Sequence, residues 1–405
     1  MNSESVDLIY ADPPFNSNRN YAAPIGSQAA GAAFKDTWAL SDLDVAWMGL
    51  IADTEPALYR VVETAGLAHG KGMQSYLCMM AVRLVEMKRL LRPTGSIYLH
   101  CDPTASHYLK TLMDVVFGRQ NFRNEIIWAY TGASNTKRWF PRKHDVVLFY
   151  VNDQSAPFDR DAVRVPYSES FMKRRRHSDA SKWEGGGDRP ESRTMAEVLD
   201  KYSAGKVVED WWSDIPILIG KERVGYPTQK PLSLLARILK ASSVENGVVL
   251  DPFCGCATAC VAAEKLNRNW VGIDLSEKAA ELVVRRVREA QGLFQDIKHR
   301  DDVPQRSDTL RVMHTYREMK HILFGEQEGV CNLCNFPFEY RILEVDHVWP
   351  KSKGGPDHIE NRQLLCPACN KIKGTGTMEE AVAKYNETYA NSAFMNVSHG
   401  RASSL

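Results

Sequence analysis

The clearest fold signal in this chain is Val248-Val249-Leu250-Asp251-Pro252-Phe253-Cys254-Gly255-Cys256-Ala257-Thr258, continued by Asn269-Trp270-Val271-Gly272-Ile273-Asp274. An apolar, β-branched run ends at an acidic turn, a helical pattern follows over residues 259–266, and a second apolar run ends on Asp274. This order predicts a β-turn-α-β unit with a ligand at its turn. The small residues Gly255 and Ala257 let the backbone approach that ligand closely. Asp274 follows at about the 20-residue spacing at which a carboxylate accepts hydrogen bonds from a ribose.

A second motif, Asp12-Pro13-Pro14-Phe15, follows an apolar strand that we predict over residues 6–11. Two consecutive prolines cannot continue a β-ladder, and they hold the backbone stiffly extended. The Asp12 carboxylate and the Pro13 carbonyl then offer two acceptors to one exocyclic amine, while Phe15 stacks on the ring that carries it. Because accepting both N–H protons frees the nitrogen lone pair for attack, the motif predicts methyl transfer to an amino group of a nucleobase.

Together with Tyr226-Pro227-Thr228-Gln229-Lys230-Pro231, these motifs resemble the catalytic, cofactor and cofactor-flanking motifs of β-class amino-DNA methyltransferases, over roughly residues 1–290. The resemblance implies an α/β, Rossmann-like, S-adenosylmethionine-dependent methyltransferase sheet with circularly permuted motif order. It implies a catalytic motif Asp12, Pro13, Pro14 and Phe15, and cofactor binding by Thr228, Lys230, Asp251, Phe253, Gly255 and Asp274. Aspartate rather than serine at position 12 favours adenine N6 over cytosine N4 as the target, and the target base must be flipped out of a DNA duplex.

The chain departs from this family pattern in two places. Cys256 and Ala257 stand where the family usually has Ser and Gly, so Ala257 adds a methyl group where the backbone must approach the cofactor. Only eleven residues precede Asp12. A segment that lines the adenine side of the cofactor pocket in the family is therefore expected upstream, or that part of the wall is missing.

Composition indicates an ordinary globular enzyme with room for two or three domains, since 44% of its 405 residues are hydrophobic and 25% are charged. A formal net charge of +1 excludes attraction to nucleic acid by a global field, so local basic patches must supply it. Neither an apolar run of about 18 residues nor a leader pattern is present, and we expect a soluble, cytoplasmic protein with no membrane partner. The nine cysteines do not form a disulfide framework.

Alternating helix and strand patterns fill the first half of the chain. They fall at residues 73–91, 96–100, 106–117, 125–129 and 145–151. We therefore expect a mixed or parallel sheet, with sites at the carboxyl ends of its strands, in a methyltransferase domain over residues 1–291. Periodicity weakens over residues 152–225, which we interpret as an inserted target-recognition region. Its basic run is expected to contact DNA phosphates, with a merely solvated face as the alternative, and consists of Lys173, Arg174, Arg175 and Arg176.

Two cysteine pairs near the C-terminus predict a zinc site: Cys331-x-x-Cys334 and Cys366-x-x-Cys369. Four thiolates complete a tetrahedral closed site, so this zinc has no open position for catalysis. It is expected to stabilise a segment too small for a large core. We assign residues 292–309 to a linker, 310–390 to this small domain and 391–405 to a tail.

Between and after the cysteine pairs, Asp346-His347, Asn361 and Asn370 occur at a spacing that resembles the HNH nuclease family. The resemblance implies a zinc-stapled ββα domain. His347 would be the general base that activates water, and Asn361 would fix its tautomer. Asp346 and Asn370 would bind one catalytic Mg²⁺ or Mn²⁺ ion.

These motifs predict a fused enzyme, an adenine-N6 DNA methyltransferase with an HNH endonuclease, acting on double-stranded DNA in restriction–modification or in connection with mobile elements. Two alternatives stay open. One is a cytosine-N4 methyltransferase whose HNH module only binds DNA. The other is a nuclease whose degenerate methyltransferase half only recognises DNA. A homodimer is compatible with either.

Overall fold

A computed structural model describes residues 1–15, 19–22, 33–36, 42–132, 136–181, 199–200, 202–218, 220–290, 297–300, 306–308 and 315–389. The chain divides into two units by its contacts. The first comprises Met1–Asp36 and Met87–Gln305, and the second comprises Thr37–Glu86 and Arg306–Leu405. This division differs from the expected domain boundaries, because residues 37–86 group with the C-terminal segment. Most of the expected linker and all of the expected tail lie outside the described residues.

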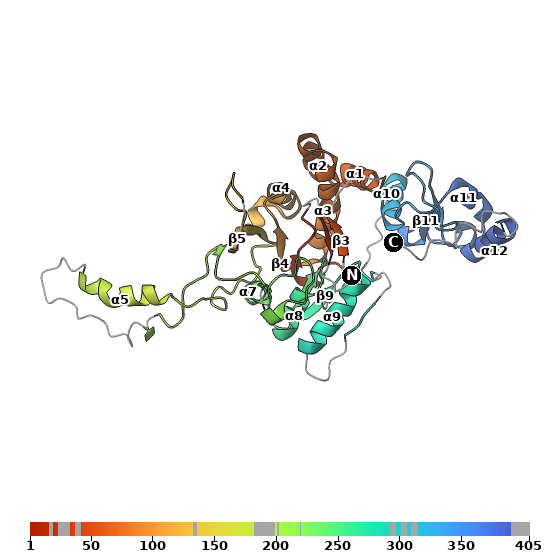
Figure 1. Cartoon of the computed structure of the whole chain (residues 1–405). Coiled ribbons are helices and arrows are strands. Elements are labelled where there is room, and N and C mark those ends of the chain that lie inside the picture. The colour runs from red at the N-terminus through yellow and green to blue at the C-terminus, as the bar shows by residue number, and fades with distance from the viewer. Residues whose placement is uncertain are drawn as a thin grey trace. The chain divides into compact units, whose positions relative to one another are not determined.

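A mixed seven-stranded sheet forms the first unit (Figure 1). Its strands are β1 (Val6–Ala11), β4 (Leu91–Cys101), β5 (Phe122–Ala129), β6 (His144–Val151), β7 (Trp211–Trp212), β8 (Val248–Asp251) and β9 (Asn269–Gly272). They lie in the order β7-β5-β6-β4-β1-β8-β9. β1 runs parallel to both β4 and β8, and β8 runs parallel to β9, whereas β6 is antiparallel to β4 and β5. The predicted mixed sheet of an α/β fold is confirmed.

Helices pack on this sheet. α7 (Leu232–Ser242), α8 (Thr258–Lys265) and α9 (Glu277–Ala290) lie side by side (Figure 1), while α4 (Ser106–Phe117) contacts β6. Successive strand side chains point to opposite faces, so alternate strand residues share the core with α7 and α8. Its members include Leu8, Tyr10, Val147, Phe149, Val151, Leu235 and Ala259. Smaller elements are the hairpin of β2 (Arg19–Ala22) and β3 (Ala33–Asp36), α5 (Glu169–Ser181), η1 (Arg119–Asn121) and η2 (Gly220–Glu222).

The second unit joins helices from both ends of the chain. They are α1 (Asp42–Thr54), α2 (Pro56–His69), α3 (Lys71–Leu90, up to Glu86), α10 (Tyr316–Glu326), α11 (Pro367–Lys373) and α12 (Met378–Tyr389). α1 packs against α10 because Gly49 leaves room for the His321 ring, which a Cβ there would approach to 2.2 Å. Asp53 pairs with Arg317 at 3.1 Å. This packing explains why residues 37–86 do not group with the sheet.

A hairpin and helix follow α10 and confirm the predicted ββα domain. β10 (Glu344–His347) pairs antiparallel with β11 (Arg362–Leu365), and α11 starts directly after Cys366. The short helices η3 (Lys351–Lys353) and η4 (Ile359–Asn361) lie between the strands. Helix α10 begins at Tyr316, where Thr315 and Glu318 form a capping box, and residues 310–314 of the expected small domain lie outside the described part.

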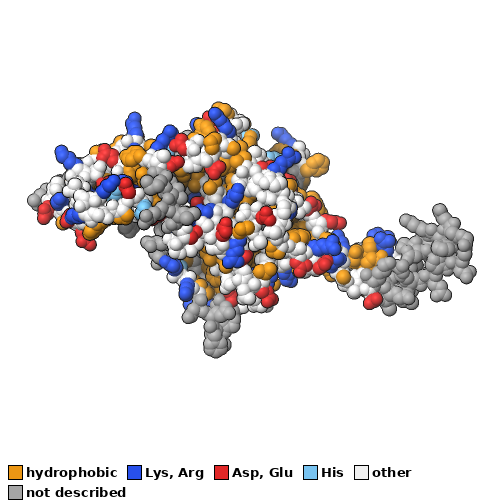
Figure 2. All heavy atoms as spheres, turned by 180° about the vertical axis from the view of Figure 1, so that it is seen from behind, with side chains coloured by type: hydrophobic (Ala, Val, Ile, Leu, Met, Phe, Trp, Pro, Cys, Tyr) orange, Lys and Arg blue, Asp and Glu red, His pale blue; other side chains and the backbone are white. Residues whose placement is uncertain are grey.

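The protein carries acidic and basic side chains in similar numbers. Acidic and basic side chains are interspersed on the face seen in Figure 2, in keeping with the formal net charge of +1. Within the described ranges, every helix is too short or too polar to cross a membrane.

Candidate functional site

The two motifs recognised in the sequence meet at one edge of the sheet. β1 and β8 are parallel neighbours, with Ile9 opposite Leu250, so Asp12 and Asp251 follow adjacent strand ends. The carboxyl ends of parallel strands are the ligand-binding edge of open α/β sheets. The two motifs therefore face a common site, although they lie far apart in the sequence.

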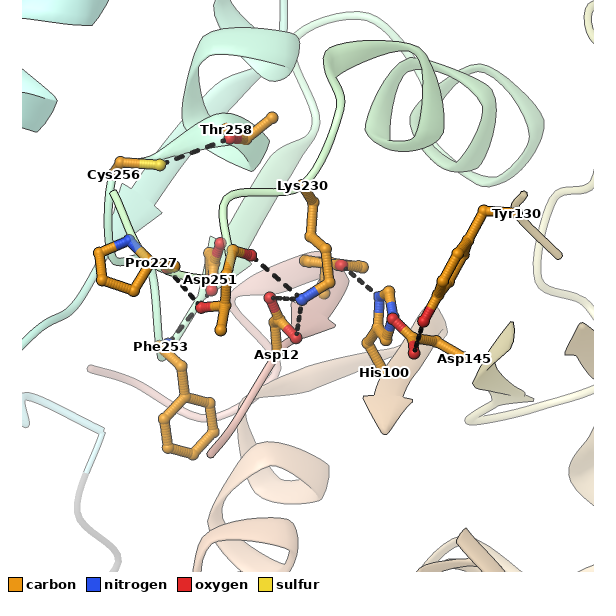
Figure 3. A network of polar contacts seen from close by, with 12 residues as sticks. Asp12, His100, Tyr130, Asp145, Pro227, Lys230, Asp251, Phe253, Cys256 and Thr258 are labelled. Atoms are coloured by element: carbon orange, nitrogen blue, oxygen red, sulfur yellow. Dashed lines mark hydrogen bonds and ion pairs between the residues drawn. The ribbon is translucent and has the colours of Figure 1, made fainter. Parts of the chain in front are cut away.

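The Asp12 carboxylate forms an ion pair with Lys230 (Figure 3). Lys230 Nζ lies 2.8 Å from Asp12 Oδ1 and 2.6 Å from Oδ2, and it also donates to the Thr228 carbonyl at 3.3 Å. The same ammonium lies 4.9 Å from the centre of the Phe15 ring. Because Lys230 is buried, water screens this pair weakly. Lys230 therefore holds Asp12 beside Phe15, while its expected part in cofactor binding stays a prediction.

A polar network that the sequence did not indicate lies against the Phe15 ring. The His100 ring stacks on Phe15, with centroids 5.7 Å apart. Its Nδ1 is 2.8 Å from the Tyr10 hydroxyl, and its Nε2 is 3.1 Å from Asp145 Oδ2. Tyr130 donates to the other Asp145 oxygen at 3.1 Å (Figure 3). The sequence signal was weak, since it consists of one histidine in an apolar strand and one aspartate at the start of another.

Burial sets the electrostatics of this network. Desolvation raises the pKa of Tyr10 well above its usual value, and the negative charges of Asp12, Asp251 and Asp145 add to the rise. Burial would also raise the pKa of Asp145, but its hydrogen bond and charge interaction with His100 outweigh desolvation and lower it. Asp145 therefore stays ionised and fixes the orientation of the His100 ring.

The loop after β8 has the geometry of a cofactor cradle. Gly255 adopts a left-handed conformation (φ 49°), and a Cβ there would lie 2.9 Å from the Tyr226 ring. Its N–H donates to Asp274 Oδ2 at 2.9 Å, while Asp251 Oδ1 accepts from the Phe253 N–H at 3.1 Å. Ala257 is also left-handed (φ 61°), a conformation that glycine adopts without the steric cost that alanine bears. The departure from the family glycine thus falls on a position that favours glycine.

These residues fit S-adenosylmethionine. Asp274, two residues beyond the end of β9, has further acceptor positions for a ribose, and the Tyr226 ring packs against the Gly255 backbone beside it. The first N–H of α7, at Leu232, donates to Glu222 Oε1 at 2.6 Å, so this group is already satisfied within the protein. Thr228 and Phe253 keep their cofactor roles as predictions.

Asp251→Asn is expected to flatten the dependence of stability on pH. Burial raises the pKa of Asp251 well above its usual value, and the charges of Asp12 and Asp274 add to the rise. The folded state therefore binds a proton that the unfolded state releases, so stability is lost as pH rises from the unfolded pKa of about 3.9 through the folded pKa. Asparagine keeps an acceptor for Phe253 and cannot ionise. Melting curves from about pH 5 to about pH 8 test this, and parallel curves for both proteins would contradict it.

Four cysteines of the second unit form a group suited to zinc. The Sγ atoms of Cys331, Cys334, Cys366 and Cys369 all lie within 4.8 Å of one another. Three of these side chains are buried and the fourth is half-buried, which matches a closed structural site. Cys331 also accepts a hydrogen bond from the Cys366 N–H at 3.2 Å. The predicted zinc site therefore has its ligand set together.

The predicted magnesium ligands are engaged by neighbouring side chains. Asp346 Oδ2 lies 2.9 Å from the ammonium of the buried Lys373 and accepts from Gln363 at 3.2 Å. Asn370 donates its amide to Glu344 at 2.7 Å. This differs from the expected pair of ligands for one cation, because the Lys373 charge opposes a divalent ion at Asp346. Binding of one Mg²⁺ or Mn²⁺ ion by Asp346 and Asn370 stays a prediction, and it requires the Lys373 ammonium to leave Asp346.

His347 and Asn361 do not contact each other as expected. His347 Nε2 lies 3.0 Å from Asp357 Oδ1, and its Nδ1 lies 3.3 Å from Arg362. Asn361 instead accepts from the Trp349 N–H at 2.8 Å and donates to the Trp349 and Pro356 carbonyls. Asn361 thus shapes the loop after His347, and Asp357 is the residue that fixes the histidine ring. Asp357 was missed because an acidic loop residue has no periodic signal.

The basic run of the expected target-recognition region lies on α5. Lys173, Arg174 and Arg175 are exposed, and Arg175 stacks over Phe171 at 5.1 Å. The side chain of Arg176 lies outside the described residues. Exposed cations on one helix are compatible with phosphate contacts, and DNA binding by this run stays a prediction.

Comparison with known proteins identifies both parts of the chain. Residues 6–285 match the family model for DNA methylases, and residues 331–376 match the model for HNH endonucleases. The chain is 25% identical over 303 residues to the type II methyltransferase M.HpaI of Haemophilus parainfluenzae, which covers 74% of each chain. It is 25% identical over 289 residues to the DNA adenine methyltransferase YhdJ of Escherichia coli (strain K12), covering 70% of this chain and 77% of that protein.

Among solved structures, the M1.HpyAVI–SAM complex aligns with a TM-score of 0.37 at 16% identity, covering 70% of this chain and 89% of that one. The family match extends over more than half of the residues of the chain. This protein therefore belongs to the DNA methylase family, and it carries an HNH endonuclease domain on its C-terminal side.

Proposed function

We propose that this chain transfers a methyl group from S-adenosylmethionine to N6 of adenine in double-stranded DNA. One observation carries the proposal: Asp12-Pro13-Pro14-Phe15 ends β1 directly beside the end of β8, where the Gly255 loop begins. An acceptor site for an exocyclic amine thus adjoins a cradle for the methyl donor. The name of the similar DNA adenine methyltransferase from Escherichia coli supports adenine as the base.

The reaction we infer uses few residues. When bound, S-adenosylmethionine supplies an electrophilic methyl group. The Asp12 carboxylate and the Pro13 carbonyl accept hydrogen bonds from the two N–H groups of the amine of a flipped base, so the nitrogen lone pair turns away from the ring and can attack. One of these two protons leaves the nitrogen as the methyl group is bound. Phe15, held by the His100 ring at 5.7 Å, stacks on the base. Lys230 holds the Asp12 side chain in place until the amine arrives.

Purified protein, duplex DNA and S-adenosylmethionine with a labelled methyl group test this proposal directly. We expect label in DNA, and, after digestion to nucleosides, in N6-methyladenine alone. Label in N4-methylcytosine would keep the mechanism and overturn the choice of base. Equal labelling of an RNA duplex of matched sequence would overturn the choice of nucleic acid.

We infer a second function, DNA strand cleavage, for the HNH domain. Its support is the family match over residues 331–376 together with His347 on β10. Supercoiled plasmid is expected to be nicked when Mg²⁺ or Mn²⁺ is added, and His347→Ala is expected to abolish nicking because it removes the general base. Asn361→Asp is not a suitable control, since Asn361 shapes the same loop. Lys384→Ala, on the exposed side of α12, is the control that should leave nicking unchanged.

The alternative is that the HNH domain only binds DNA. One arrangement favours it: His347 is held by Asp357 and Arg362, and Asp346 is held by Lys373. Absence of nicking with either metal, while plasmid binding persists, would establish this alternative. Both versions are compatible with a role in restriction–modification, in a bacterial cytoplasm, and with a homodimer, which we retain as hypotheses.

A further inference from the structure

The connection between β5 and β6 carries a group of side chains that the proposed reaction does not use. We call residues 136–143 of this connection the hairpin tip. β6 is antiparallel to β4, with Val146 opposite Cys101, and β4 is parallel to β1, with Leu99 opposite Ala11. Residues just before β6 therefore lie at the carboxyl edge of the sheet. The hairpin tip leaves the sheet at the same edge as Asp12.

Two large aromatic side chains of the hairpin tip are exposed to solvent. Phe140 is 93% exposed and Trp139 is 65% exposed, although burying such rings is what normally stabilises a fold. Four cations surround them in sequence, at positions 137, 138, 142 and 143, and residues 136–143 include no acid. Within the described part of the chain, Lys137, Arg138 and Arg142 form no ion pair. Two exposed aromatic side chains flanked by cations complement a polyanion whose interior consists of stacked aromatic rings.

The base of the hairpin tip is tied to the proposed catalytic pocket. The Tyr130 N–H donates to the Lys143 carbonyl at 3.0 Å, which closes the hairpin below the tip. Tyr130 then donates through its hydroxyl to Asp145, and Asp145 contacts His100, the ring that stacks on Phe15. The hairpin tip is therefore anchored to the group that would hold the flipped base.

We propose that the hairpin tip opens duplex DNA for this enzyme, with Trp139 and Phe140 entering the base stack and the cations holding the flanking phosphates. This inference rests on the proposed function. Proteins that flip or kink a duplex insert apolar side chains between base steps to offset the loss of stacking. Side chains that fill the gap in the base stack, which we call wedge residues, keep the extruded base from returning. They should therefore speed methylation of a paired target base and not of a target base that is already unpaired.

The test compares wild type with Trp139→Ala/Phe140→Ala on two duplexes that differ only in the position opposite the methylated base. One duplex has the complementary base at that position, and the other has an abasic site. On the paired duplex kcat/KM should fall about tenfold to a hundredfold, the range expected for lost aromatic stacking. On the unpaired duplex kcat/KM should return to within about threefold of wild type, because opening is no longer needed. Leu67→Ala removes another strongly exposed apolar side chain, at 86% exposure, and should change neither value.

Binding separates this inference from the proposed function. Fluorescence anisotropy should give wild type a higher affinity for the duplex with the abasic site, and Trp139→Ala/Phe140→Ala should enlarge that preference, because the variant loses affinity for the paired duplex alone. If wild type transfers no methyl group, the proposed function fails, and the binding preference alone then decides whether the wedge exists. Equal losses on both duplexes, or no loss on either, would overturn the wedge; capture of a protein partner by Trp139 and Phe140 without any effect on DNA would do the same.

The cations of the hairpin tip allow an independent test of the proposal. Lys137→Gln/Arg142→Gln should weaken binding to both duplexes alike and lower the slope of log K against log salt by about two, since each phosphate contact contributes about one. An unchanged slope would remove DNA phosphates as the partners of the hairpin tip.

Discussion

Asp12→Ala is expected to lower methyl transfer to DNA about a thousandfold, because it removes the acceptor that activates the exocyclic amine. Binding of S-adenosylmethionine should persist, since Asp251 ends β8, and Gly255 and Asp274 lie in the segments that follow β8 and β9. Single-turnover methyl transfer measures the first effect and titration calorimetry measures the second. Methylation at an undiminished rate would show that Asp12 is not the catalytic acceptor.

The ion pair with Lys230 demands a control for this variant. Lys230 is 7% exposed, so removal of Asp12 leaves a buried ammonium without its partner carboxylate. Breaking a buried pair on one side costs about 3–5 kcal/mol. Asp12→Ala/Lys230→Met removes both charges and should recover most of the stability without recovering activity. If the double variant methylated DNA, the loss in Asp12→Ala would reflect unfolding and not chemistry.

Removal of zinc is expected to unfold the second unit and to spare the sheet of the first. Zinc held by thiolates contributes about 10–16 kcal/mol in small domains, more than this unit's apolar cluster can replace. That cluster includes Cys331, Cys366 and Cys369 themselves. The core of the sheet includes none of the four ligands. A chelator or Cys366→Ser should therefore abolish one of two unfolding transitions and release one zinc ion per chain.

Cys78→Ala is the matched control for the zinc variant. Cys78 is a buried cysteine of the same unit that lies on α3 and outside the ligand group. It should shift the melting temperature slightly and keep the metal. Two unchanged transitions in the chelated protein, with zinc absent by elemental analysis, would contradict a structural role for the four cysteines.

Local patterns were enough to predict the sheet and its site edge. The run at Val248 to Asp274 encodes strand, turn, helix and strand in neighbouring residues, and each of these elements is present. The rule that parallel strands expose their carboxyl ends at one edge then brings Asp12 and Asp251 together. Cysteine spacing predicted the ligand group in the same way, because two short turns are themselves local.

Contacts between distant residues were not accessible from these patterns. Lys230 and Asp12 are 218 residues apart, and nothing in either motif indicates that the lysine meets the carboxylate. His100 and Asp145 belong to strands that pair only in the folded sheet. Asn361 was wrong as the partner of His347 because the loop from Trp349 to Asp357 folds back and uses its amide. Helix α1 showed no motif, so its packing against α10 was missed.

The central claim is that this chain methylates a base of DNA through Asp12, and nucleoside mass spectrometry of plasmid DNA from cells expressing it is the most direct test. Plasmid from cells expressing Asp12→Ala, at matched protein level, is the control. We predict N6-methyladenine with the wild-type chain, and none above background with the variant, in a host that lacks its own adenine methylation. Equal amounts in both samples, or no methylated base in either while the folded protein is present, would contradict the account.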